Sequence, residues 1–339
     1  MQQPTLAQVE AALSLVYSVM PPTPQYTWPL LNQRFGQRFG ADTELWLKHE
    51  NHSPLGAFKL RSTLVYATWL SEANPGVTTL VAATRGNHGQ GVGLAARRLG
   101  LKAIIVVPHG NSREKNLAMK AQGVELIEHG EDFQAALEHA RSLAGQPGCV
   151  LVESLHPKLV EGTATYALEL FRNAPPLDAV YVPVGMASSI CGVAAVRNAL
   201  GLATEIVGVV PVDAPASALS FRERRIVPAP ARTRLADGLA CRQPNPEAMQ
   251  IIWDNVARFV EVTETEIAHA MRFVFEDTHN IAEGAAAASV AAALKEHPQK
   301  QYKRIAAILT GGNVDRELFT SAINDPESAG HPESAGASA

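Results

Sequence analysis

The 339-residue sequence has little of what marks secreted, membrane or nucleic-acid-binding proteins. Its three cysteines, Cys149, Cys191 and Cys241, are odd in number and widely spaced, which indicates reduced core thiols rather than a disulfide or zinc framework. No stretch of about 18 apolar residues occurs, and the N-terminus has no basic start or apolar run, so we expect no membrane span and no signal peptide. The net charge of −4 gives no electrostatic reason to bind nucleic acid. We therefore expect a cytoplasmic protein.

What is present is the composition of a globular protein, with 46% apolar and 18% charged residues. From residue 78 onward, short β-branched runs alternate with amphipathic helical stretches, which is typical of βαβ units and parallel sheets. The predicted strands are Thr79–Ala83, Ala103–Val107, Val124–Ile127, Val150–Val152, Ala179–Val184, Ile206–Val210, Phe259–Val262 and Arg304–Leu309. The predicted helices are Gly91–Leu99, Ser112–Gln122, Phe133–Leu143, Ile190–Leu200, Glu264–Glu276 and Glu283–Lys295, with Gly162–Phe171 and Met249–Asn255 as further segments of the series.

This alternation predicts an α/β fold of two domains, each a mostly parallel sheet flanked by helices. We assign residues 1–78 and 155–325 to a large domain and residues 79–154 to a small one. The Pro- and Arg-rich stretch Arg224–Arg234 is expected to be an exposed loop, and the small, polar residues 326–339 a disordered tail. The crevice between the domains is the expected binding site.

Four short segments carry residues suited to chemistry. In the first, Ser53–Lys59 places a lysine after a turn punctuated by Pro54 and Gly56. Such a turn can present the amine inward, where burial lowers its pKa and makes it nucleophilic. A loop lysine paired with an acid is the alternative.

The second segment, Thr84–Gly91, follows a buried strand and opens a helix. Ligands bind at the carboxyl ends of such strands, and glycines let the backbone approach them. Asn87 or His88 could instead serve only as a helix N-cap. A turn that carries Thr84, Arg85, Asn87 and His88 together has more polar groups than capping needs, which favours a site.

The third and fourth segments also follow strands. Small residues at Gly185–Ser189 precede a helix, where successive backbone N–H groups can hold an anion. No Walker lysine or GxGxxG pattern is present, so phosphate binding is plausible but the ligand stays open. Thr310–Asn313 places a hydroxyl and two glycines at a strand end, which suits a flat ligand or a simple turn equally well.

Taken together, from Pro22 to Asn313, these segments resemble the fold type II pyridoxal-phosphate family of serine and threonine dehydratases and serine racemase. The resemblance implies pyridoxal 5'-phosphate as cofactor, an amino acid as substrate and a homodimer. It makes Lys59 the catalytic Schiff-base lysine and Asn87 the partner of the cofactor's phenolic oxygen. The implied cofactor-binding residues are Phe58, Lys59, Asn87, Gly185, Met186, Ala187, Ser188, Gly238, Glu283 and Thr310, and the implied substrate-binding residues are Thr84, Arg85, Asn87 and His88.

Departures from the family pattern narrow the implied activity. Met186 and Ala187 replace glycines, which backbone donors tolerate if φ stays negative. Arg85 stands where serine racemase-like members carry a proton-transferring serine, and a guanidinium is a poor base, so racemisation is disfavoured. Val210, Ala214 and Ala216 occupy the family's cation-ligand positions, so we expect no metal requirement.

The resemblance therefore implies a dehydratase that converts a β-hydroxy-α-amino acid to a 2-oxo acid and ammonia. The sequence looks closest to phenylserine dehydratase-like enzymes, with threonine or serine as further substrates. Arg85 could frame a substrate ring, bind the second carboxylate of threo-3-hydroxyaspartate, or form a salt bridge across the crevice. A β-replacement synthase and a non-catalytic amino-acid sensor are the rival interpretations.

Overall fold

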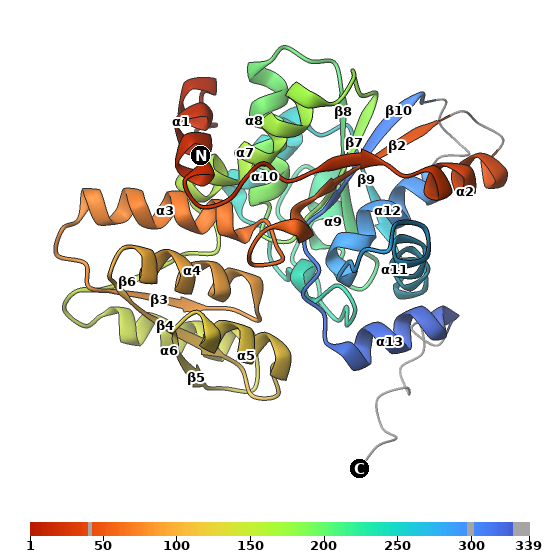
Figure 1. Ribbon diagram of the computed structural model, residues 1–339. Coiled ribbons are helices and arrows are strands. Elements are labelled where there is room, and N and C mark those ends of the chain that lie inside the picture. Colours follow the sequence, from red (N-terminus) through yellow and green to blue (C-terminus); the bar gives the residue numbers. More distant parts are fainter. Residues whose placement is uncertain (40–42, 297–301, 328–339) are drawn as a thin grey trace.

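A computed structural model of the chain describes residues 1–39, 43–296 and 302–327. Its strands form two separate sheets with helices on both faces (Figure 1), which confirms the predicted α/β fold class. Most of the predicted tail at 326–339 lies outside the described residues, which end at 327. No helix in the described ranges is both long and apolar enough to cross a membrane.

The larger sheet has six strands in the order β1-β2-β10-β7-β8-β9. Only β1 runs antiparallel, against β2. The strands are β1 (Gln25–Thr27), β2 (Glu44–His49), β7 (Ala179–Pro183), β8 (Glu205–Pro211), β9 (Arg258–Val262) and β10 (Arg304–Leu309). Because side chains alternate along a strand, β10 contributes to two hydrophobic cores. Ile305 and Leu309 pack on one face of the sheet, and Ala306 and Ile308 pack on the other.

Helices cover both faces of this sheet, as a buried parallel sheet requires. The first core includes α2 (Pro29–Phe39), α11 (Glu264–Thr278), α12 (Gly284–Glu296) and α13 (Arg316–Asn324). The second includes α7 (Pro157–Asn173), α8 (Ser188–Ala199) and α10 (Pro246–Asn255), with α1 (Leu6–Tyr17) against α7. The segment Arg224–Arg234 is a loop, as predicted; α9 (Ala216–Glu223) precedes it and the short 3-10 helix η2 (Asp237–Leu239) follows it.

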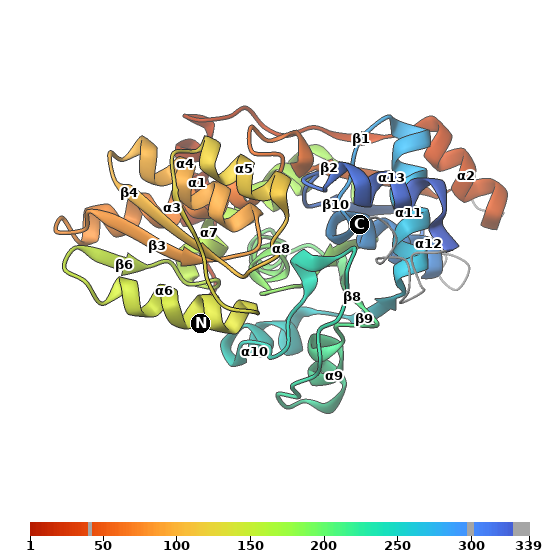
Figure 2. The ribbon, with the colours of Figure 1, turned by 90° about the horizontal axis from the view of Figure 1, so that it is seen from below.

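The smaller sheet has four parallel strands in the order β5-β4-β3-β6. They are β3 (Thr79–Ala83), β4 (Lys102–Val107), β5 (Glu125–Glu128) and β6 (Cys149–Leu151), covered by α4 (Asn87–Arg98), α5 (Arg113–Ala121) and α6 (Phe133–Ala144). Figure 2 shows these strands and helices beside the elements of the larger sheet. All its elements fall within residues 79–154, so we propose that segment as the small domain and residues 1–78 and 155–325 as the large one.

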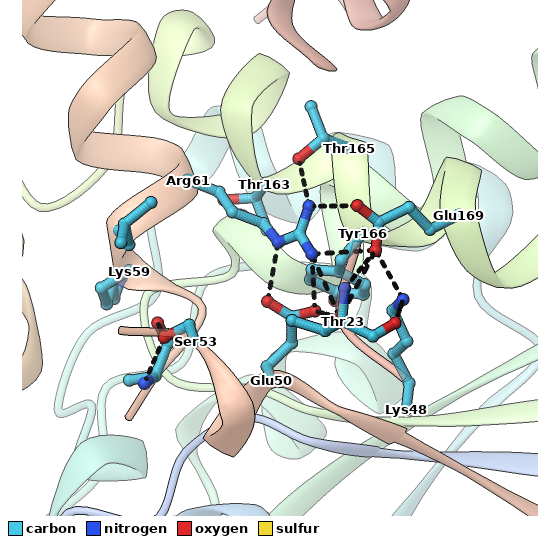
Figure 3. A network of polar contacts seen from close by, with 12 residues as sticks. Thr23, Lys48, Glu50, Ser53, Lys59, Arg61, Thr163, Thr165, Tyr166 and Glu169 are labelled. Atoms are coloured by element: carbon cyan, nitrogen blue, oxygen red, sulfur yellow. Dashed lines mark hydrogen bonds and ion pairs between the residues drawn. The ribbon is translucent and has the colours of Figure 1, made fainter. Parts of the chain in front are cut away.

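A buried cluster of charges joins the two ends of the segment that carries Lys59. That segment runs from the short 3-10 helix η1 (Glu50–His52) to α3 (Lys59–Ala73). Arg61 Nε donates to Glu50 Oε2 at 2.8 Å, and Arg61 Nη1 donates to Glu169 Oε1 at 2.7 Å. Lys48 Nζ also donates to Glu169, at 2.6 Å, so two cations face two anions (Figure 3). Because all four side chains are at most 1% exposed, their charges are compensated inside the protein.

Candidate active site

One cavity brings together every residue that the sequence analysis assigned to a site. It opens where β3, β7 and β10 end, between the two sheets, and its empty volume with the open mouth included is about 1070 Å³. Such a position, beyond the carboxyl ends of parallel strands, is where α/β proteins bind ligands. The predicted residues that line it are Phe58, Lys59, Thr84, Arg85, Asn87, His88, Gly185, Met186, Ala187, Ser188, Gly238, Glu283 and Thr310.

Lys59 is the first residue of α3 and projects into this cavity. Its side chain borders the empty space and is half-buried. The protein around the amine nevertheless excludes enough water to lower its pKa to about 8. No carboxylate of the described residues forms an ion pair with its amine, whose close neighbour is the Phe58 ring, 4.8 Å from Nζ. The alternative of a loop lysine paired with an acid is therefore wrong for the described chain.

The backbone around Lys59 is tied to the end of β10. Phe58 N donates to Thr310 O at 3.0 Å, and Gly312 N donates to Gly56 O at 2.9 Å. Gly56 has a φ of +65°, a conformation that favours glycine. These contacts place Lys59 and Thr310 on adjoining walls of the cavity, so the first and fourth predicted segments form one structure.

The Thr84–Gly91 segment begins α4 earlier than predicted. The helix starts at Asn87, not at Gly91, and its N-cap is Gly86, so the reading of Asn87 or His88 as an N-cap is wrong. Asn87 is free to use its amide elsewhere: Nδ2 donates to Glu283 Oε1 at 2.9 Å. Thr84 Oγ1 accepts from Gly86 N at 3.1 Å and closes the turn.

His88 is a neutral imidazole at the cavity wall. Burial, with the nearby charge of Lys59 as the second cause, lowers its pKa to about 3. Within the described ranges, neither ring nitrogen has a hydrogen-bond partner of normal geometry. Both nitrogens are shielded from solvent, and the backbone of Val152 lies close enough to act on the ring and oppose the lowering of its pKa. His88 therefore lines the same cavity as Lys59 as an uncharged ring.

The small-residue loop differs from expectation in its backbone. Ala187 has a φ of +68°, in the left-handed region, so the condition of negative φ is not met. Gly185 is required for a different reason: a Cβ there would lie 2.5 Å from Gly238 O. Ala187 is also the N-cap of α8. Among the described residues, none accepts a hydrogen bond from the backbone N–H of Gly185, Met186 or Ala187, which leaves these donors for an anion.

Glu283 lines the cavity, and Asn313 contacts Asn87, which also lines it. Burial raises the pKa of Glu283 to about 7, although the nearby Lys115 cation lowers it. Asn313 Nδ2 donates to Asn87 Oδ1 at 2.8 Å. The sequence analysis gave Asn313 no role because nothing in the order of residues places it beside Asn87. Its place beside Thr310 in the Thr310–Asn313 segment is the one sequence signal that points to it.

The cavity lining also includes two cationic and two apolar side chains, namely Arg85, Lys115, Phe133 and Met186. Arg85 is exposed and forms no ion pair with any described residue, so the predicted salt bridge across the crevice is not found there. Lys115 Nζ instead contacts Asp237 Oδ2 at 2.6 Å, joining α5 to η2 across the two halves of the site. Phe133 and Met186 add apolar surface to the cavity.

The other predicted features concern metals and thiols. Val210, Ala214 and Ala216 are buried, and no group of three metal-binding side chains occurs in the described ranges. The absence of a metal requirement stays a prediction. The cysteines are unpaired: Cys191 and Cys241 are buried, where burial raises the pKa of their thiols, and Cys149 is half-buried.

Pyridoxal 5'-phosphate fits the groups that this cavity provides. Its aldehyde needs an amine that is not locked in an ion pair, and Lys59 supplies one. Its phosphate needs converging N–H donors, which the free amides of Gly185, Met186 and Ala187 at the start of α8 supply. These residues would hold the cofactor, and Asn87 lines the same cavity.

Known proteins share this architecture. The model of the family described as "Pyridoxal-phosphate dependent enzyme" matches residues 20–311. The chain is 33% identical over 282 residues to an L-threonine ammonia-lyase of Thermotoga maritima, covering 83% of this chain and 70% of that protein. It is 29% identical over 325 residues to an L-threo-3-hydroxyaspartate ammonia-lyase of Saccharomyces cerevisiae, covering 96% and 98%. The crystal structure of a pyridoxal 5'-phosphate-dependent aspartate racemase superposes with a TM-score of 0.86 at 28% identity, covering 94% and 98%.

The family model spans more than half of the chain, and the first of these relatives exceeds 30% identity over most of it. Both findings agree with the fold and with the cofactor that the cavity fits. The predicted cofactor is therefore confirmed. The chain belongs to the pyridoxal-phosphate dependent enzyme family, among its serine and threonine dehydratase-like members.

Proposed function

We propose that the protein is a dehydratase that converts a β-hydroxy-α-amino acid to a 2-oxo acid and ammonia. The observation that carries this proposal is the unpaired amine of Lys59, with a pKa lowered to about 8, in a cavity that fits pyridoxal phosphate. The ammonia-lyase activity named for two relatives of high coverage supports the same reaction class. Overall, the substrate loses the Cα proton and the β-hydroxyl as water, and addition of water then releases ammonia and leaves the 2-oxo acid.

Different residues of the cavity have different roles in the proposed reaction. When bound, pyridoxal phosphate withdraws electrons from the substrate Cα. Lys59, neutral in part at physiological pH, takes the Cα proton. Thr84 and the N–H groups at the start of α4 bind the substrate carboxylate, because a helix N-terminus favours an anion. Thr310 would help to hold the cofactor with a neutral hydroxyl, which, unlike a carboxylate, would not keep the cofactor ring protonated.

For the side chain of the substrate, we propose an aromatic group, as in phenylserine. Phe133, Met186 and Leu239 line the cavity with apolar surface, and Arg85 at the mouth can stack on a ring. One observation favours a second candidate, threo-3-hydroxyaspartate. The guanidinium of Arg85 has no acidic partner among the described residues, and a relative that covers nearly the whole chain is named for that substrate.

The test measures 2-oxo acid and ammonia from phenylserine, threonine and threo-3-hydroxyaspartate, with and without a chelator. We expect release from phenylserine with the highest kcat/KM, no effect of chelator, and loss of all activity in Lys59→Ala. Arg85→Met should cost hydroxyaspartate turnover about a hundredfold if the guanidinium binds its second carboxylate, and phenylserine turnover far less. Thiol incorporation without 2-oxo acid would instead establish a β-replacement synthase, and no visible band from Lys59-bound cofactor would indicate a sensor.

A further inference from the structure

The orientation of the Asn87 amide depends on a chain of hydrogen bonds that begins at a backbone carbonyl. Leu55 O accepts from Asn313 Nδ2 at 2.8 Å. A carbonyl oxygen can only accept, so this contact fixes which end of the Asn313 amide carries the N–H groups. The same Nδ2 has a second proton, which it donates to Asn87 Oδ1 at 2.8 Å. Asn313 therefore holds the Oδ1 atom of the Asn87 amide on its own side.

The nitrogen end of the Asn87 amide is turned the other way as a result. Its Nδ2 lies 2.9 Å and 3.1 Å from the two carboxyl oxygens of Glu283. One N–H is engaged there, and Asn87 lines the cavity, where its second N–H can serve a ligand. The amide thus presents a donor, not an acceptor, to the bound cofactor.

Glu283 alone could not enforce this orientation. Because burial raises its pKa to about 7, its carboxyl group holds a proton for part of the time at neutral pH. A protonated carboxyl can donate to Asn87 Oδ1 as readily as a carboxylate accepts from Nδ2. The Asn313 Nδ2 can only donate, so it distinguishes the two orientations at every pH.

Close packing keeps Asn313 itself from rotating. Gly56, with its φ of +65°, lies against Asn313, and a Cβ on Gly56 would come within 2.8 Å of Asn313 Oδ1. The Gly312 N to Gly56 O bond of 2.9 Å ties the two segments together at this point. The segment that carries Lys59 thereby also sets the position of Asn313.

We propose that Asn313 is a positioning residue that holds the Asn87 amide with its N–H toward the phenolic oxygen of the cofactor. This inference rests on the proposed role of Asn87 and adds the residue that determines which atom Asn87 presents. Without Asn313, the Asn87 amide can flip and place an oxygen against that phenolic oxygen, which repels it. The effect concerns the electronic state of the bound cofactor and is separate from the stability of the fold.

The experiment titrates the visible absorbance of the holoenzyme with pH. A donor at the phenolic oxygen stabilises its anionic form and so lowers the pKa of the lysine-linked cofactor. We expect Asn313→Ala to raise the midpoint by about one pH unit, the equivalent of one hydrogen bond. Asn87→Ala should raise it by a similar amount, because both variants remove the same donor.

Asn32→Ala is the matched control. Asn32 Oδ1 accepts from the backbone N–H of Leu45 at 3.0 Å, so it is also a structural asparagine, but its partner is Leu45, whereas that of Asn313 is the cavity residue Asn87. We expect Asn32→Ala to lower the thermal unfolding midpoint while it leaves the spectral midpoint unchanged. If Asn313→Ala does not fold, Asn313→Ser is titrated by the same criterion.

Two failures are distinguishable. An Asn313 variant that binds the cofactor with the wild-type spectral midpoint overturns the inference and leaves the proposed function standing. A wild-type protein that forms no visible band with pyridoxal phosphate contradicts the proposed function before any variant is tested.

Discussion

Lys48 is buried and Lys59 is half-buried, and their partners distinguish a structural role for Lys48 from the chemical role proposed for Lys59. Lys48 Nζ contacts Glu169 at 2.6 Å and the carbonyl oxygen of Thr23 at 2.8 Å, so its charge is compensated. Lys59 has no such partner among the described residues, and burial lowers its pKa. A buried cation without a counter-charge is unfavourable, which is what makes the neutral, nucleophilic amine accessible.

The first prediction concerns the reactivity of Lys59 with pH. With a pKa of about 8 in the folded protein, against 10.5 for an ordinary lysine, the neutral fraction rises as pH rises through 8. It grows roughly thirtyfold between pH 6.5 and 9 and then levels off. We expect the rate at which apoprotein gains the visible cofactor band to follow this curve. A rate that still climbs tenfold per unit between pH 9 and 10 would contradict the lowered pKa.

At the scale of elements, the turn between β7 and α8 combines two backbone constraints. Ala187 adopts a left-handed conformation, and Gly185 lies too close to Gly238 O for any side chain. The left-handed conformation costs a non-glycine residue about 1–2 kcal/mol. The strain is located where the free N–H groups converge, which suggests that anion binding maintains it.

The second prediction compares substitutions in and beside this turn. Ala187→Gly should stabilise the apoprotein by up to about 1 kcal/mol, because relief of the left-handed strain outweighs the added freedom of the unfolded chain. Gly185→Ala should cost about 1–3 kcal/mol through the clash with Gly238 O. Ala195→Gly, inside α8, is the control and should cost about 1 kcal/mol. Urea unfolding measures all three, and destabilisation by Ala187→Gly would refute the strain argument.

Sequence patterns located most elements after residue 78 because their signals are local. Strands β3 and β10 were predicted with their observed ends, and β6 was displaced by one residue. Strand β2 was missed because Lys48 interrupts its apolar alternation. The reason that Lys48 can be buried is Glu169, which lies 121 residues away. Long-range compensation of charge is invisible to any local pattern.

In the candidate site, too, features with a local sequence signal were predicted, and features that depend on long-range contacts were not. Lys59 and Thr310 were identified from their neighbours in sequence, and the cavity brings them together as expected. The left-handed backbone at Ala187 was not predicted, since alanine carries no sign of it. Asn313 was passed over because its importance lies in a contact with Asn87 across 226 residues. Local sequence is enough to propose Lys59 and Thr310 as site residues, and only the fold shows the contacts around them.

The third prediction concerns the charged cluster, which fixes the segments around Lys59 to the large sheet (Figure 3). Arg61 donates to both Glu50 and Glu169, so Arg61→Met leaves two buried carboxylates with too few partners. We expect a loss of about 3–5 kcal/mol in the free energy of unfolding. Arg172→Met, which breaks the exposed pair with Glu10, is the control and should cost less than about 1 kcal/mol. Urea unfolding measures both losses. Similar values in the two variants would show that the buried cluster contributes no more to the free energy of unfolding than an exposed ion pair.

At the scale of the whole molecule, the two sheets are held together across the mouth of the cavity by contacts of α5. Lys115 Nζ lies 2.6 Å from Asp237 Oδ2, and Ser112 Oγ donates to Asp315 Oδ1 at 2.5 Å. Both acceptors belong to the half of the chain that carries the larger sheet. These contacts are partly solvent-exposed, with 31% exposure at Asp237, so each stabilises the contact between the two halves of the chain only modestly.

The fourth prediction follows from that modest stabilisation. Asp237→Asn removes the ion pair but keeps the size of the side chain, so α5 should separate from η2 more often without unfolding of either sheet. We expect amide hydrogen exchange in residues 113–121 to quicken by about threefold, which corresponds to about 0.6 kcal/mol, while residues 189–199 of α8 keep their rates. Lys158→Met, which breaks an ion pair contained within α7, is the control and should change neither segment. Unchanged exchange in α5 of Asp237→Asn would mean that packing, and not this ion pair, determines how the small-sheet half closes over the cavity.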